Sequence, residues 1–123
     1  MELNEITSTI IGAAIEVHRT LGPGLLESIY QKCLAAELSD RGLKFEAEKP
    51  VPVRYKHHTF DSELKYDFLV EGQVVVETKT VEKLLPIHQA QLMSYMKLLH
   101  CKLGLLINFK VCVLKDGIKR VIL

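Results

Sequence analysis

The sequence has few cysteines, no long apolar run and almost no net charge, and each of these absences excludes a class of protein. Cys33, Cys101 and Cys112 are odd in number and widely spaced, so we expect buried reduced thiols rather than a disulfide framework or a C-x-x-C zinc pair. No apolar run approaches the roughly 20 residues that span a bilayer, so we expect no membrane contact. The N-terminal stretch MELNEITSTI lacks the basic and apolar segments of a secretory signal, and we expect a cytoplasmic protein.

A net charge of +1 does not by itself indicate a nucleic-acid-binding protein, but the charges are unevenly distributed. Residues 1–78 contain eight Lys or Arg against thirteen Asp or Glu, whereas residues 79–123 contain eight against two. This asymmetry can place a positive surface beside an acidic site, as binding of a phosphate backbone requires. The alternative is that solvated lysines simply cluster late in the chain.

What is present is the composition of an ordinary globular domain, with 48% apolar and 25% charged residues. A chain of 123 residues can bury a real core, and it contains no repeat, low-complexity tract or linker. We therefore expect residues 1–123 to form a single domain.

Two helices are predicted at the start of the chain. Residues 4–21 place apolar side chains at helical spacing, with Asn4 as the expected cap, and Gly22-Pro23-Gly24 ends this helix. A second helix is predicted for residues 25–41, with Gly42 after it.

The rest of the chain alternates between strand and helix patterns. Residues 50–56, 62–70 and 73–80 are strand-like, a helix opens at Pro86, a buried strand covers residues 102–110, and residues 111–123 suggest a hairpin turning at Asp116-Gly117. Three strands followed by a helical crossover to another strand predict an α/β sandwich with a mixed sheet. The second helix should cover one face of this sheet and the Pro86 helix the other.

The stretch VVVETKT, Val74–Thr80, ends a buried strand with two charged side chains on one face, Glu77 and Lys79. Asp67 lies in the preceding strand. A two-residue loop of Glu71-Gly72 would send Asp67 to the opposite face, whereas an odd loop centred on Gly72 would place it directly opposite Glu77. We predict the odd loop, because three-residue hairpins commonly need a glycine in the left-handed region.

Two facing carboxylates must either raise a pKa or bind a cation. Lys79 can neutralise only one of them, so a divalent ion such as Mg²⁺ or Mn²⁺ is the expected resolution. The lysine is then free to orient a water molecule or to offset charge on a phosphoryl group. The alternative is a structural ion-pair cluster, and the pattern alone does not exclude it, since Glu63-Leu64-Lys65 has the same E-x-K form.

The segment GLLESIY, with Gly24, Glu27 and Tyr30, resembles the G-x-x-E-x-x-Y signature of a family of small bacterial and archaeal proteins grouped with the PD-(D/E)XK nucleases. The resemblance covers nearly the whole chain. It implies an αβββαβ restriction-endonuclease-like core with a mixed sheet flanked by helices, to which an N-terminal helix and a C-terminal hairpin are added. The nuclease motif, an acid followed by E-x-K on the next strand, corresponds to Asp67 and Glu77-Thr78-Lys79.

Three further residues extend the resemblance. Glu27 matches the helix glutamate that many such nucleases add to the metal site, and Gln91 and Tyr95 match the Q-x-x-x-Y motif of RecB-like nucleases. The sequence departs from the family at Thr78, where leucine is frequent, and at Lys65, where an arginine near the acid is frequent. Neither departure removes a ligand.

The resemblance implies a metal-dependent phosphodiester hydrolase acting on DNA. Asp67, Glu77 and the Thr78 carbonyl would bind Mg²⁺ or Mn²⁺, Glu27 would complete the site directly or through water, and Lys79 would position the attacking water. The residues expected to contact backbone phosphates are Lys83, Lys97 and Lys102. Without a large basic surface, affinity should be modest unless the protein forms a homodimer or acts with a partner. The rival interpretation is a nuclease-fold binding or regulatory module without turnover.

Other chemically active side chains have simpler expected roles. Tyr30 should pack rather than react, and His57 and His58 should lie in a surface turn. A structural role is expected for His18, and His88 is retained as a substrate contact because it opens the helix near the site.

Overall fold

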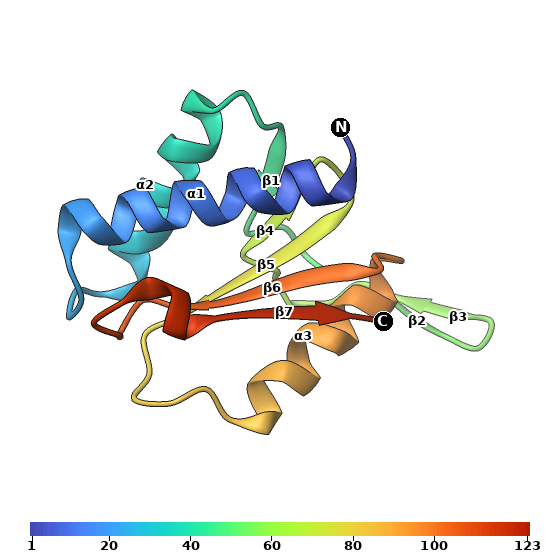
Figure 1. Cartoon of the computed structure of the whole chain (residues 1–123). Helices are drawn as coiled ribbons and strands as arrows, with labels where there is room; N and C mark the ends of the chain where they lie inside the picture. The colour runs from blue at the N-terminus through green and yellow to red at the C-terminus, as the bar shows by residue number, and fades with distance from the viewer.

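The computed structural model describes all 123 residues, and its centre is a five-stranded mixed β-sheet with helices on both faces (Figure 1). In chain order the elements are α1 (Leu3–Leu21), α2 (Glu27–Asp40), β1 (Phe45–Ala47), β2 (Val53–Tyr55), β3 (His58–Phe60), β4 (Phe68–Val70), β5 (Val74–Lys79), α3 (Pro86–Leu98), β6 (Leu103–Asn108), the 3₁₀ turn η1 (Leu114–Gly117) and β7 (Ile118–Ile122). No helix has both the length and the apolar character required to cross a lipid bilayer.

The strand order of the main sheet is β1-β4-β5-β6-β7. All neighbouring pairs are antiparallel except β5 and β6, which are parallel and are connected by the α3 crossover. Helix α2, strands β1, β4 and β5, helix α3 and strand β6 therefore form the αβββαβ order expected from the sequence, with α1 as the additional N-terminal helix. The prediction of a mixed sheet in a restriction-endonuclease-like fold is confirmed.

The two faces of the sheet have separate apolar cores. Val74 and Val76 of β5 pack with side chains of α1 and α2, whereas Val75 packs with α3. Successive side chains of a strand point to opposite faces, so a strand covered on both sides is apolar at every position. The predicted placement of the second helix and the Pro86 helix on opposite faces is confirmed.

The expected first core strand, residues 50–56, is not in the main sheet. That position belongs to β1, and residues 53–60 form a separate two-stranded hairpin, β2–β3. Pro50 and Pro52 lack the N–H groups that would continue a ladder, and Glu48 has a positive φ of 53°, which turns the chain at the end of β1. The prediction that residues 50–56 form a strand of the main sheet was therefore wrong.

The prediction that residues 111–123 form a C-terminal hairpin is also wrong. The chain forms η1 where a strand was expected, and β7 pairs antiparallel with β6. The buried Asn108 side chain determines this path: its Oδ1 accepts hydrogen bonds from Val81 N and Lys110 N, at 3.1 and 3.2 Å. Gly117 lies so close that a Cβ there would be 2.3 Å from the Asn108 carbonyl oxygen.

Two local expectations also need correction. Helix α1 begins one residue earlier than predicted, and Asn4 does not cap it, because its Oδ1 accepts a hydrogen bond of 2.9 Å from Arg120 Nη2. All three cysteines are unpaired as expected, but only Cys101 is buried; Cys33 is half-buried and Cys112 is exposed.

Candidate active site

The β4–β5 hairpin brings Asp67 and Glu77 together. Val70 pairs with Val74 across the three-residue loop Glu71–Gln73, and the same register places Asp67 directly opposite Glu77. Gly72 has a φ of 65° in this loop, as the predicted turn requires. Two hydrogen bonds hold the pair: Asp67 N donates to Glu77 Oε2 at 3.0 Å, and Thr78 N donates to Asp67 Oδ2 at 2.8 Å. The odd-loop prediction is confirmed.

The environment of Glu77 favours its protonated form. Its side chain is only 5% exposed. Burial is the main cause that raises the pKa of Glu77 to about 9, and the nearby charge and hydrogen bonding of Asp67 raise it further. Without a cation the pair therefore retains a proton near neutral pH. Carboxylate oxygens are the donors that hard divalent cations such as Mg²⁺ prefer.

Lys79 lies on the same face of β5 as Glu77, but it does not form a salt bridge with either carboxylate. All four salt bridges in the protein involve other residues. Lys79 Nζ instead donates a hydrogen bond of 3.3 Å to Gln91 Oε1 of α3. Its charge acts on the acids at longer range and lowers the pKa of Glu77 in opposition to burial. This geometry differs from the structural ion-pair cluster considered as the alternative.

Glu27 is the first residue of α2, the helix that packs on the opposite face of the sheet from α3. Burial is the main cause that raises its pKa, and the charge of Asp67 raises it further, which places the two carboxylates within electrostatic reach. The start of α2 is held by Tyr30, whose hydroxyl accepts a hydrogen bond from Leu25 N at 3.1 Å and donates one to the Gly22 carbonyl. Tyr30 is fully buried and stacks on Phe109, so it packs as expected.

No three His, Cys, Asp or Glu side chains converge closely enough to hold a metal ion by themselves. A metal ion held by Asp67 and Glu77 would therefore need further ligands other than these side chains. Of the two roles considered for Glu27, the one through water suits this geometry.

A hydrogen-bond chain that the sequence analysis missed connects Glu27 to Asp67. Gln31 Nε2 donates to Glu27 Oε2 at 3.3 Å and to Thr78 Oγ1 at 3.1 Å. Thr78 Oγ1, which is fully buried, donates in turn to Asp67 Oδ2 at 3.1 Å. The i, i+4 spacing of Glu27 and Gln31 was the available signal, but only the fold brings Thr78 to them.

Helix α3 contributes the third side of the site. Gln91 and Tyr95 are one turn apart, and Tyr95 is 7% exposed. Burial raises the pKa of Tyr95, and the charges of Glu77 and Asp67 raise it further. The six candidate catalytic side chains thus come from α2, the β4–β5 hairpin and α3.

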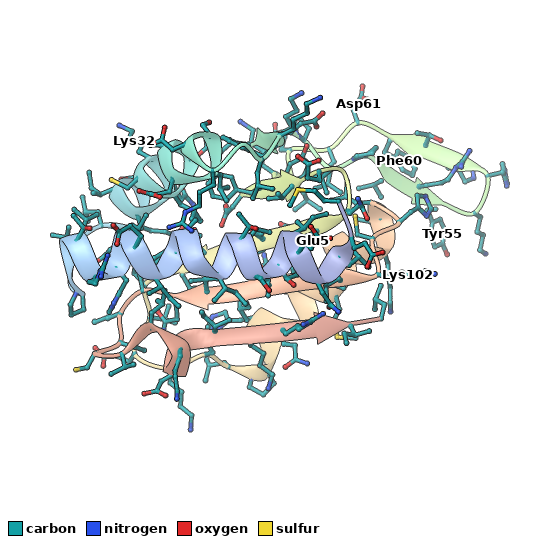
Figure 2. All side chains as sticks on the ribbon, turned by 45° about the horizontal axis from the view of Figure 1, so that its top comes forward. Glu5, Lys32, Tyr55, Phe60, Asp61 and Lys102 are labelled. Carbon is teal, nitrogen blue, oxygen red and sulfur yellow. The ribbon has the colours of Figure 1, made fainter.

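A cavity of about 210 Å³ opens beside Asp67 on the α2 side. Its lining consists of Ser28, Gln31, Lys32, Ala35, Ala47, Glu48, Asp67 and Phe68. Lys32, which Figure 2 shows near one end of the molecule, is the only cation in this lining, and the sequence analysis did not select it.

The three lysines expected to contact phosphates are not together. Lys83 is exposed in the loop that follows β5, at the same end of the sheet as Lys79. Lys102 precedes the start of β6, whose first residue pairs with Val74, and so lies at the opposite end, in the region of Tyr55 (Figure 2). Lys97 is in the last turn of α3. Only Lys83 therefore lies at the carboxylate end of β5.

The histidines lie apart from the carboxylates or have structural partners. His18 Nε2 is 2.7 Å from the carbonyl oxygen of Val111, a residue 93 positions later in the chain, and this contact is part-buried. His88 Nδ1 accepts a hydrogen bond of 2.9 Å from Leu85 N and so caps α3. His57 and His58 are exposed at the turn of the β2–β3 hairpin, as predicted.

The comparison with protein families agrees with this geometry. The model of a family in the PD-(D/E)XK nuclease superfamily matches residues 4–121, which is nearly the whole chain. No curated protein and no solved structure matched the chain. The family match and the fold together lead to one conclusion: the chain belongs to the PD-(D/E)XK nuclease superfamily.

Proposed function

We propose that this protein is a Mg²⁺- or Mn²⁺-dependent nuclease that hydrolyses phosphodiester bonds of DNA. The observation that carries the proposal is the Asp67–Glu77 pair beside a lysine that neutralises neither acid by direct contact. The high pKa of Glu77 supports the proposal. Without a metal ion the carboxylate pair retains a proton, and a divalent cation would replace that proton and stabilise both ionised carboxylates.

Asp67, Glu77 and the Thr78 carbonyl are the proposed metal ligands. The bound ion would supply Lewis-acid polarisation of a phosphoryl oxygen and a lowered pKa of water. The protein's own contribution is orientation: Thr78 N and Oγ1 hold Asp67 Oδ2, while Asp67 N holds Glu77 Oε2. Glu27 adds a third negative charge at the edge of the site.

Lys79 is proposed to orient the attacking water and to offset negative charge on the phosphoryl group. Its hydrogen bond to Gln91 keeps the ammonium on the carboxylate face of β5. Gln91 and Tyr95 would then line the groove in which the scissile phosphate lies. Lys83 would contact the phosphate backbone of the DNA at this end of the sheet. Lys97 and Lys102 would contact a more distant part of the same DNA strand.

The rival is a nuclease-fold module that binds nucleic acid without cleaving it. An intact acid-acid-lysine set favours turnover, because a site that is no longer used need not retain every member. A cleavage assay separates the two.

The test is cleavage of single-stranded, double-stranded and branched DNA in Mg²⁺ or Mn²⁺, using wild type, Asp67→Asn and Lys79→Ala. We expect each substitution to lower kcat by a factor of about 100 or more while thermal unfolding stays cooperative. The chain offers matched controls, since Asp61 and Lys65 are exposed and Lys65 belongs to the second E-x-K sequence. Asp61→Asn and Lys65→Ala should therefore cleave like the wild type.

Equal cleavage by wild type, Asp67→Asn and Lys79→Ala would contradict the proposed enzyme. Metal-dependent binding of DNA without cleavage by the wild type would favour the rival module.

A further inference from the structure

The β2–β3 hairpin forms a small two-stranded sheet of its own, separate from the main sheet. It projects from the end of the molecule where the C-terminus lies (Figures 1 and 2). The eight residues Val53–Phe60 include Arg54, Lys56 and two histidines but no acidic residue. Neither Arg54 nor Lys56 forms a salt bridge.

One face of this hairpin, called here the ring face, is formed by the rings of Tyr55, His58 and Phe60 together with the aliphatic side chain of Val53. These four residues share a face because Val53 pairs with Phe60 and Tyr55 with His58. Tyr55 is 59% exposed and Phe60 is 52% exposed, whereas the other three tyrosines of the protein are buried. The rings of His58 and Phe60 are stacked, with centroids 6.1 Å apart.

One of the two cations of the hairpin lies against these rings, and the other lies on the opposite face. Lys56 Nζ lies 5.3 Å from the centroid of the Tyr55 ring, and Arg54 extends from the opposite face of the ribbon. Exposed flat rings interleaved with cations and free of acids complement a nucleic-acid strand whose bases are unpaired, because bases stack on rings and phosphates pair with cations.

The size of the ring face argues against a second copy of the chain as its occupant. Two half-exposed aromatic side chains offer on the order of 200 Å², whereas a stable interface buries about 800 Å² per partner. We propose that the ring face binds single-stranded nucleic acid by base stacking, with Arg54 and Lys56 contacting the phosphates.

The hairpin is connected to the candidate active site by a hydrogen-bonded ribbon. Val51 N donates to the Leu64 carbonyl at 2.6 Å, and Glu48 N donates to the Asp67 carbonyl at 3.1 Å. Asp67 is seven positions after Phe60 in the chain, so their Cα atoms are at most about 25 Å apart. A single-stranded nucleic acid bound on the ring face can therefore extend to the Asp67–Glu77 carboxylate pair. This consequence for cleavage rests on the proposed nuclease function, whereas the binding itself does not.

The binding test uses the wild-type protein in EDTA, where cleavage is blocked, and fluorescein-labelled DNA or RNA of about 20 nucleotides. We expect Tyr55→Ala together with Phe60→Ala to raise the Kd for single-stranded DNA and RNA by a factor of about 10 to 100, by loss of base stacking. Tyr55→Phe and Phe60→Tyr keep the rings and should bind like the wild type. Ile15→Ala removes a partly exposed apolar side chain of α1 and serves as the matched control.

Equal binding by wild type and the double alanine variant would overturn the inference. It would also be overturned if sedimentation showed a wild-type dimer that the double variant dissociates, because the ring face would then bind a second copy.

Cleavage in Mg²⁺ separates this inference from the proposed function. With single-stranded substrates long enough to reach both places, the double alanine variant should raise KM about tenfold or more and leave kcat unchanged. Ring-dependent binding in EDTA by a protein that never cleaves would support the ring face and contradict the nuclease. Efficient cleavage of single-stranded substrates that is the same for the wild type and the double alanine variant would support the nuclease and contradict the ring face.

Discussion

Replacing Glu77 with glutamine removes one of the two facing carboxylates while keeping nearly the same side-chain shape. Burial and Asp67 raise the pKa of Glu77 from its ordinary value of 4.5 to about 9 in the folded protein. Between these pH values the folded chain holds a proton that the unfolded chain has released. The free energy of unfolding of the metal-free wild type should therefore fall as pH rises through this window, and Glu77→Gln should not show this contribution.

The magnitude follows from the slope of one proton. A difference of one bound proton changes stability by about 1.36 kcal/mol per pH unit, so the stability of Glu77→Gln relative to wild type should increase by up to about 2.7 kcal/mol between pH 6 and pH 8. For a domain of this size that corresponds to a relative shift in Tm of roughly 10 °C. Relaxation and hydration of the site would reduce this value without changing its sign.

The assay is urea unfolding in EDTA at several pH values for wild type and Glu77→Gln, with Glu63→Gln as the control at an exposed glutamate. Each variant differs from the wild type at a single position, so the difference between the curves isolates the effect of residue 77. Parallel curves for wild type and Glu77→Gln would show that the folded protein retains no extra proton at Glu77. At pH 8, Mg²⁺ at 100 times its Kd should add about 2.7 kcal/mol to the wild type and much less to the glutamine variant.

Other substitutions test the surroundings of the site. Thr78→Val keeps the backbone hydrogen bond to Asp67 but removes the hydroxyl, and it should lower kcat about tenfold with an unchanged fold, as single-turnover cleavage and circular dichroism would measure. Tyr30→Phe loses two buried hydrogen bonds at the start of α2 and should reduce the free energy of unfolding by about 1–2 kcal/mol in urea titrations. Gly104→Ala would place a Cβ 2.6 Å from Met96 Sδ; a cost of about 1–3 kcal/mol is expected in the same assay, and an unchanged stability would show that α3 moves aside freely.

The β4–β5 hairpin shows how much local sequence can predict. Its strands are apolar, its loop is odd in length, and Gly72 can adopt the positive φ that this loop requires. These features are local, so the pairing of Asp67 with Glu77 followed from the sequence. The helical positions of Glu27, Gln91 and Tyr95 followed from periodicity in the same way.

The segments that were predicted incorrectly depend on contacts distant in the sequence. Residues 53–60 have a strand pattern, but two prolines and the bend at Glu48 direct them out of the main sheet. The path of residues 109–117 depends on Asn108, whose side chain bonds to Val81, a residue 27 positions away. A local pattern contains no information about such partners.

The amino-acid pattern was sufficient to predict the three helices, the mixed sheet with helices on both faces, and the hairpin that places two acids opposite each other. These follow from periodicity, turn chemistry and the handed connection of parallel strands. Only the tertiary structure decided that Gln31 and Thr78 connect Glu27 to Asp67, that Lys79 bonds to Gln91 rather than to a carboxylate, and that Lys102 lies at the far end of the sheet. The physical reason is that hydrogen bonding and burial of side chains depend on where separate elements pack, which no single segment of the chain specifies.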